Sequence, residues 1–429
     1  MRYTPPSKKL YTQNRANFRK LMEPGAMAVF HSNDQMPTGA DGLMPFRQNN
    51  DLLYLSGIDQ EDTILLIFPD FALEEQREIL FLKETSELIA IWEGHKFTKE
   101  EARELSGIQT IYWVSEFEKV FNTLMAEAKK VYLNTNEHIR AVVEVETRDA
   151  RYAKWCQAKY PAHTYLRSAP LMHQLRAIKS KEELVMMQKA CDITNDAFRR
   201  VLKFTKPGVK EYEIQAEFMH EFLKQGSRGF AYEPIIGSGH NACVLHYIEN
   251  NSVCQEGEVI LMDVGAEYGN YNADMTRCVP VSGRFTQRQK DVYNAVLHVK
   301  NEAEKMLRPG NVIPEYHKEV GLIMQDQLVK LGLIDKTDIK NQDPENPAYR
   351  KYFMHGTSHH LGLDVHDVGN IYRKMEEGMV FTCEPGIYIP EENLGIRIED
   401  NLVIRKDGLD NLMGDIPIEV EEIEEIMNA

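Results

Sequence analysis

Short apolar runs alternate with longer amphipathic segments over the first part of the chain. The amphipathic segments have helical spacing, as at 14–23 and 115–130. The apolar runs have the length of single β-strands and stand at 26–30, 62–69, 78–83 and 131–134. Because strands that alternate with helices build a layered sheet, this part is predicted to be an α/β domain.

A long amphipathic helix is predicted to open a second domain. Ser180 and Glu183 have the spacing of a capping box, in which each side chain accepts a hydrogen bond from the other residue's amide. Apolar residues follow at helical spacing as far as Val201, and Pro207 ends the pattern. Further helices are expected at 211–225, 287–307 and 314–332, and strands at 258–268, 271–281, 379–389 and 395–405. The expected domains are residues 1–172 and 173–429.

Composition and charge narrow the class of protein. A chain of 429 residues with 43% apolar residues can bury the cores of two domains. Acidic residues outnumber basic ones by 66 to 50, which gives a net charge of −16 and disfavours nucleic acid or an anionic membrane as a partner. The longest apolar runs, such as 64–68, are far shorter than a membrane span.

The first residues and the cysteines favour a cytoplasmic location. Basic residues near the N-terminus have no apolar segment behind them, so a secretory signal is not expected. The six cysteines form no CxxC pair, and reduced thiols are the simplest interpretation. A secreted protein with a few disulfides is the less favoured alternative. The cysteines are Cys156, Cys191, Cys243, Cys254, Cys278 and Cys383.

Two aspartates interrupt the strands predicted between 258 and 281. Taken singly, Asp263 and Asp274 are most simply caps, turn residues or exposed acids, because aspartate is rarely buried without a partner. A hairpin centred within 267–270 would place them face to face, where two like charges would repel unless a cation lay between them. Tyr-Gly is not a favoured two-residue turn, so a longer loop with a shifted register is the alternative.

Two glutamates repeat this arrangement near the C-terminus. Glu384 and Glu399 each interrupt an apolar run, and their midpoint lies within 390–393. Strand alternation places Arg397 on the same face as Glu399, where it could orient a neighbouring carboxylate. The alternative is that Arg397 and Glu399 form an ordinary surface ion pair.

The segment HGTSHHLGLDVHD at 355–367 holds four of the 14 histidines. Imidazoles together with four carboxylates suit two hard divalent cations, and four negative charges balance two double positive ones. The cations expected are Mn²⁺ first, with Zn²⁺, Co²⁺, Fe²⁺ and Mg²⁺ as alternatives. A hydroxide shared by two cations could hydrolyse an amide, and the chain has no GxSxG motif that would indicate a serine nucleophile.

These motifs together resemble a known family. HGTSHHLGLDVHD, with VILMDVGAEY, YNADMTR, FTCEPGIY and GIRIEDN, is similar to the pita-bread metallopeptidases and most closely to the aminopeptidase P family. Four other segments add to the likeness: FRQNNDLLYLSGI, IWEGHKFT, LRAIKSKEEL and GSGHNACVLHYIEN. The resemblance covers nearly the whole chain. It implies an α/β domain of creatinase type followed by a pita-bread catalytic domain.

The resemblance also implies a role for each site residue. Asp263 would bind one metal, Asp274 and Glu399 would bridge both, and His359 and Glu384 would complete the second. Glu384 would also carry a proton toward the leaving nitrogen. The matching positions that bind substrate and stabilise the tetrahedral intermediate are His246, His355 and His366. His360 occupies a variable position and is interpreted as structural.

The implied activity is removal of the first residue of peptides that have proline in second position. An Xaa-Pro bond is a tertiary amide without an N–H, so it requires a dedicated site. The nearest alternative is a prolidase, which accepts only Xaa-Pro dipeptides. A pita-bread binding module and the metal-free creatinase are disfavoured because all five ligands are present. Family resemblance further implies a homodimer or homotetramer.

Overall fold

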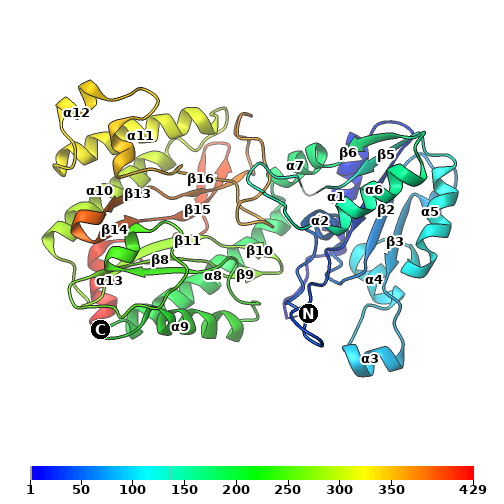
Figure 1. Ribbon diagram of the computed structural model, residues 1–429, viewed down its shortest axis with the longest axis horizontal. Coiled ribbons are helices and arrows are strands. Elements are labelled where there is room, and N and C mark those ends of the chain that lie inside the picture. The colour runs from blue at the N-terminus through cyan, green and yellow to red at the C-terminus, as the bar shows by residue number, and fades with distance from the viewer. Residues whose placement is uncertain (1, 136) are drawn as a thin grey trace. The chain divides into compact units, whose positions relative to one another are not determined.

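The computed structural model describes residues 2–135 and 137–429 and divides into two compact units (Figure 1). The N-terminal unit comprises residues 5–176, and the C-terminal unit comprises residues 177–429 together with the first residues of the chain. Among the described residues, every helix is too short or too polar to cross a lipid bilayer. All six cysteines are free thiols, as expected.

The N-terminal unit is built on a six-stranded mixed sheet with the order β4-β3-β2-β1-β5-β6. The four strands predicted from the apolar runs are all present, and the structure adds β4 and β6. The strands are β1 Ala26–His31, β2 Ile64–Ile67, β3 Glu78–Leu82, β4 Thr110–Trp113, β5 Lys130–Leu133 and β6 Thr164–Arg167. The helices are α1 Lys8–Leu21, α2 Asn50–Ser56, α3 Glu87–Glu93, α4 Lys99–Ser106, α5 Phe117–Met125, α6 Arg148–Lys159 and α7 Ala169–Ala177.

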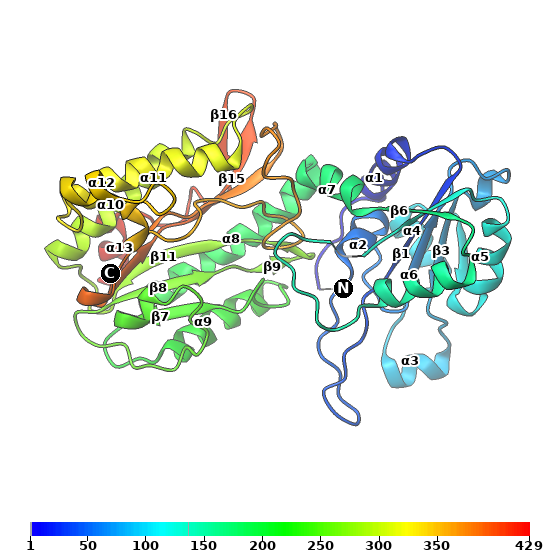
Figure 2. The same ribbon diagram turned by 45° about the horizontal axis from the view of Figure 1, so that its top comes forward.

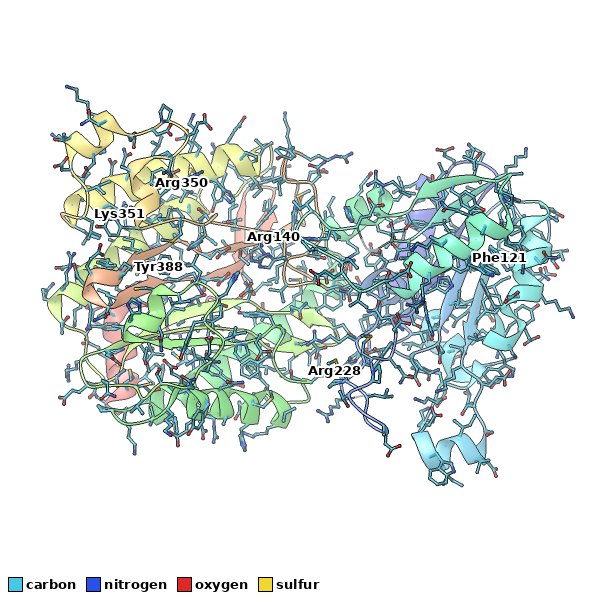
Figure 3. All side chains as sticks on the ribbon, viewed as in Figure 1. Phe121, Arg140, Arg228, Arg350, Lys351 and Tyr388 are labelled. Carbon is cyan, nitrogen blue, oxygen red and sulfur yellow. The ribbon has the colours of Figure 1, made fainter. Side chains whose placement is uncertain are left out.

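Aromatic rings fill the core between this sheet and α5 and α6. Phe121 lies on α5 (Figure 3) and is fully buried. Its ring stacks on Phe117 at 5.2 Å and meets the edges of Tyr152 and Tyr160. Such clusters add to the apolar area removed from water, which is the main stabilising term of the unit.

Helices of the C-terminal unit lie on both sides of a set of small antiparallel sheets, with α8 and α9 on one side and α10 and α11 on the other (Figures 1 and 2). The sheets have the orders β11-β8-β7, β12-β15-β16, β13-β14 and β10-β9. The helices are α8 Lys181–Phe204, α9 Glu211–Lys224, α10 Gln287–Glu304, α11 Ile313–Lys330, α12 Lys336–Asn341 and α13 Val420–Met427. The strands are β7 Ile235–Ser238, β8 Val259–Val264, β9 Glu267–Tyr268, β10 Tyr271–Asn272, β11 Met275–Pro280, β12 Val380–Cys383, β13 Gly386–Ile389, β14 Leu394–Arg397, β15 Asp400–Arg405 and β16 Gly408–Asn411.

Helix α8 begins as the sequence predicts. The Ser180 hydroxyl accepts from the amide of Glu183, and the Glu183 carboxylate accepts from the amide of Ser180. This capping box satisfies amides that the first turn leaves without intrahelical partners. The apolar face, including Met187 and Phe198, is fully buried. The helix ends at Phe204, just before Pro207.

The hairpin that carries the two aspartates turns one residue later than predicted. Asp263 on β8 pairs with Thr276 on β11, so it does not face Asp274. The turn residues Gly269 and Asn270 have φ angles of 60° and 69°. Positive φ at both central positions is what the favoured two-residue hairpin turn requires, and Gly-Asn supplies it. The predicted opposition of the aspartates is therefore wrong. The register is shifted, as the alternative had it, but the turn has two residues and is not the longer loop.

The second hairpin has the predicted register. Cys383 at the end of β12 pairs with Asp400 at the start of β15, and β13 and β14 continue the same alignment. Glu384 and Glu399 are the next residues inward, so they occupy matching positions where the ladder is interrupted. The chain reverses at Pro390–Glu392, followed by Asn393 with a φ of 50°. Glu384 and Glu399 are thus held opposite each other on the two sides of the hairpin.

Candidate metal centre and active site

Three side chains from separate segments form the centre of the site. Asp274 precedes β11, His359 lies in the loop before β12, and Glu399 lies between β14 and β15. Each offers a ligand atom, and these atoms all lie within 4.8 Å of one another. Aspartate, histidine and glutamate at this separation are a suitable donor set for a divalent cation.

Glu384 and Asp263 extend this group. His359 Nε2 lies 3.4 Å from Asp274 Oδ2 and 3.7 Å from Glu384 Oε1. Asp263 is joined to Asp274 through the hydroxyl of Tyr232, which donates to Oδ1 of each carboxylate at 2.5 and 2.7 Å. The five residues that the sequence identified as candidate ligands therefore converge in the C-terminal unit.

Arg397 provides a positive charge beside these carboxylates. Its Nη2 donates to Asp263 Oδ2 at 2.6 Å, and its Nη1 donates to the Tyr388 hydroxyl at 2.8 Å. Tyr388 lies on β13, among the strands of the unit (Figure 3). Arg397 and Glu399 are only 4% and 2% exposed, so the alternative of a surface ion pair is wrong. Arg397 thus contacts the Asp263 carboxylate, where it could orient this side chain.

The carboxylates are costly to ionise in this environment. Burial raises the pKa of Glu399 well above its ordinary value, and the negative charges of Asp274 and Glu384 raise it further. Burial raises the pKa of Glu384 to about 7, although the positive charges of His359 and Arg397 oppose the rise. Burial also raises the pKa of Asp263, against the effect of Arg397. The single positive charge of Arg397 does not balance the negative charges of these carboxylates.

Divalent cations fit this arrangement. Four carboxylates around one imidazole repel one another unless positive charge is placed among them. Cations would supply that charge, and carboxylate oxygens with one nitrogen match Mn²⁺, Zn²⁺ and related ions. The chemistry of the donor set is therefore consistent with a metal centre.

The orientation of His359 also suits a metal ligand. Its Nδ1 contacts the carbonyl of His360 at 2.9 Å, and its backbone amide donates to the Thr382 hydroxyl. A ring whose Nδ1 donates to a carbonyl presents Nε2 as the coordinating atom. Burial lowers the pKa of His359, but the carboxylates of Asp274 and Glu384 outweigh it and raise the pKa overall.

His355 and His366 lie beside this group. The ring of His366 stacks on that of His359, with centroids 4.0 Å apart, and His366 is exposed. His355 Nδ1 is 3.8 Å from Glu384 Oε2. Burial lowers the pKa of His355 to about 3, and the charges of Arg397 and His246 contribute in the same direction. His246 is exposed.

Both ring nitrogens of His355 contact protein atoms. Nδ1 lies 2.8 Å from the carbonyl of Gly356, and Nε2 lies 2.8 Å from the Tyr388 hydroxyl. His360 is buried against the ring of Phe381 at 4.3 Å. This packing agrees with the structural role expected for His360.

Sequence reasoning missed several residues that support the carboxylates. Thr276 donates from its hydroxyl to Glu399 Oε2 at 2.6 Å. Asn401 accepts from the amide of Asp274. The Tyr232 hydroxyl contacts Asp263, and the Tyr388 hydroxyl contacts His355. Each is an ordinary strand or loop residue in the sequence, and only the correct hairpin register would have indicated Thr276, which pairs with Asp263.

Family comparisons agree with this geometry. Residues 185–406 match the model of metallopeptidase family M24, and residues 11–132 match the N-terminal domain of aminopeptidase P. The predicted fold class, an N-terminal α/β domain followed by a pita-bread domain, is confirmed.

Individual relatives match over nearly their full length. The Xaa-Pro aminopeptidase of Escherichia coli (strain K12) is 36% identical over 437 residues, which cover 99% of this chain and 98% of the relative. Human Xaa-Pro aminopeptidase 3 is 32% identical over 395 residues, covering 89% and 76%. Zn-substituted E. coli aminopeptidase P in complex with product superposes with a TM-score of 0.87 at 34% identity, covering 99% of both chains. Pseudomonas aeruginosa aminopeptidase PepP gives 0.89 at 30% identity, covering 100% and 99%. The chain therefore belongs to metallopeptidase family M24 and, within it, to the aminopeptidase P family of metallo-aminopeptidases.

Proposed function

We propose that this metal-dependent, proline-specific aminopeptidase uses two divalent cations to remove the first residue from Xaa-Pro-peptides. The observation that carries the proposal is the convergence of four carboxylates and one imidazole, with the pKa values of Glu399, Glu384 and Asp263 raised by burial. The negative charges of these buried carboxylates are costly without a positive partner, and a bound cation would stabilise them. The relatives named above carry the specificity for Xaa-Pro bonds.

The five ligands divide between the two cations. Asp263 would hold one, Asp274 and Glu399 would bridge both, and His359 and Glu384 would complete the second. Asp274 and His359 support this division because they lie within bonding range of a common ion. Mn²⁺ is the first choice, because carboxylate oxygens dominate the donor set.

When bound, the cations would polarise the scissile carbonyl and supply a shared hydroxide as nucleophile at neutral pH. Cleavage then requires a proton at the proline nitrogen, which leaves as a secondary amine. Glu384 would carry it, because its Oε1 lies 3.7 Å from His359 Nε2, within the group of proposed ligands.

The histidines would contact the substrate. His246 and His366 are exposed, and the His366 ring stacks on that of the proposed ligand His359, so both could donate hydrogen bonds to a bound peptide. Burial lowers the pKa of His355 to about 3, so His355 would act as a neutral imidazole. To contact substrate it would exchange its bond to Tyr388 or Gly356.

A metal-titrated assay on a small peptide panel tests the proposal. Metal-free protein is titrated with Mn²⁺, Zn²⁺, Co²⁺, Fe²⁺ or Mg²⁺ and offered an Xaa-Pro dipeptide and an Xaa-Pro-Xaa tripeptide. Cleavage of the tripeptide ahead of proline, with saturation near two metal ions per chain, is the expected result. Cleavage of the dipeptide alone would favour a prolidase and reject the proposal.

Exposed apolar side chains support a homo-oligomer, as a homodimer or homotetramer. They lie on three segments of the N-terminal unit, two loops and the helix α3, which follow β1, β5 and β3. These strands run in the same direction, so the three segments follow the same edge of the sheet. The side chains are Met36, Leu43, Met44, Leu88, Ile91, Trp92, Ile139, Val142, Val143 and Val145. Large exposed apolar patches commonly mark protein contacts.

Light scattering measures the oligomeric state directly. Ile91, which is 77% exposed, is replaced by glutamate, and the molar mass should fall relative to the parent.

The six free thiols also support a reducing compartment, and we infer a cytoplasmic location.

A further inference from the structure

One loop of the C-terminal unit carries His246 between two fixed limbs. We define the His246 loop as residues 239–251, which follow β7 and precede the segment that returns to the start of α9. The returning segment is held by backbone bonds, with the amide of Glu211 donating to the carbonyl of Ser252 and that of Cys254 to the carbonyl of Val209. His246 itself is exposed at the tip.

The carboxylate of Glu211 holds both limbs of this loop. Its Oε1 accepts from the amide and the hydroxyl of Ser238, both at 2.8 Å, and from Asn241 Nδ2 at 3.2 Å. Its Oε2 accepts from the Tyr247 hydroxyl at 2.8 Å and from the amide of Ser252 at 2.9 Å. Five hydrogen bonds thus converge on one side chain. They come from before, within and after the His246 loop.

Glu211 needs these donors because of its burial. Glu211 is fully buried, and a buried carboxylate is tolerated only when donors stabilise its charge. Hydrogen bonds to a charged group are roughly twice as strong as neutral ones, so the five donors form a rigid cluster. One of them, Tyr247, is buried and adjacent to His246 in the sequence. The position of the His246 backbone is therefore tied to Glu211.

We infer that Glu211 is a positioning residue for catalysis, which fixes His246 through the Tyr247 hydroxyl and the two limbs of the loop. The inference rests on the proposed function, because it takes His246 to contact the peptide substrate. Glu211 would not touch substrate or metal. It would act by holding the His246 loop, and displacing a substrate-positioning group by about 1 Å can lower a rate about 100-fold.

The substitution Glu211→Gln tests the carboxylate. Both carboxylate oxygens accept from backbone amides, at Ser238 and at Ser252. An amide side chain of the same shape must turn its NH₂ group toward one of these donors, so one limb loses its anchor in either orientation. We expect kcat/KM to fall about 10- to 100-fold, with the metal content unchanged.

The milder substitution Tyr247→Phe keeps the fold and removes one anchor. It deletes only the hydroxyl of the residue that follows His246, and we expect about a 10-fold loss in kcat/KM. Tyr293→Phe is the matched control, because that buried hydroxyl donates to the carbonyl of Ile418 at 2.7 Å, away from the His246 loop. A similar loss of activity in both variants would overturn the inference.

A double-mutant cycle separates positioning from general destabilisation. If Tyr247 acts through His246, the double variant His246→Ala/Tyr247→Phe should match His246→Ala within about twofold. Multiplied losses would overturn the inference while leaving the role of His246 intact. Full activity of His246→Ala would instead remove His246 from the proposed site, and the inference with it.

Limited proteolysis gives a readout that does not depend on activity. Chymotrypsin is added to the full chain, and cuts within 239–251 are mapped by mass spectrometry. Glu211→Gln and Tyr247→Phe should both be cut faster there than the parent and Tyr293→Phe, because a released loop opens more often. Equal cutting rates in all four proteins would overturn the inference even if the peptidase activity proved different from that proposed.

Discussion

Replacing Glu384 by glutamine should make the metal-free protein more stable, although the side chain is a proposed metal ligand. Burial raises the pKa of Glu384 from 4.5 to about 7. Between these values the folded protein binds more protons than the unfolded chain, so stability falls as the pH rises. The cost is absent below about pH 4.5 and complete above about pH 7. A glutamine side chain does not ionise, so the variant does not carry this cost of ionisation.

The size of the effect follows from the shift in pKa. Each unit is worth about 1.4 kcal/mol, so a rise from 4.5 to about 7 corresponds to about 3 kcal/mol at pH 8. Near pH 5 the same difference should fall below about 1 kcal/mol. Glu391→Gln is the matched control, because Glu391 is an exposed glutamate on the same hairpin, and it should change stability by less than about 0.5 kcal/mol.

Urea unfolding in the presence of a chelator measures these differences at pH 8 and pH 5. Circular dichroism is the appropriate signal, because Trp92, Trp113 and Trp155 all lie in the N-terminal unit. Adding Mn²⁺ should reverse the order, since only the parent keeps a complete ligand set and gains stability by binding. Equal stability of parent and Glu384→Gln at pH 8 without metal would refute the electrostatic account of the centre.

Three substitutions separate the ligands from their neighbours. Asp274→Asn should abolish turnover and weaken metal binding by more than about 100-fold, because a bridging ligand loses its charge, and normal turnover with full metal content would remove Asp274 from the site. His366→Ala should lower kcat/KM about 100-fold while elemental analysis finds the metal content unchanged, and loss of the metals would make His366 a ligand instead. Tyr232→Phe should weaken Mn²⁺ binding about 10-fold in calorimetry, because Asp263 and Asp274 lose a shared donor, and unchanged affinity would contradict this role.

The sequence determined the local elements and the residue types of the site. Apolar periodicity and the Ser180 capping box define α8, because both depend on residues close together in the chain. The same is true of the Glu384 and Glu399 hairpin, whose turn lies between them. The Gly269-Asn270 turn was equally local, and the preference of these residues for positive φ would have given the correct register.

Only the tertiary structure decided which distant side chains meet and which of them are buried. Tyr232 reaches Asp263 and Asp274 from a different segment, and Glu211 gathers donors from either side of the His246 loop. Arg397 would be an ordinary surface residue if solvent reached it, and its burial makes it the partner of Asp263. These contacts depend on how packed layers bring separate segments together, and no short stretch of sequence encodes that packing.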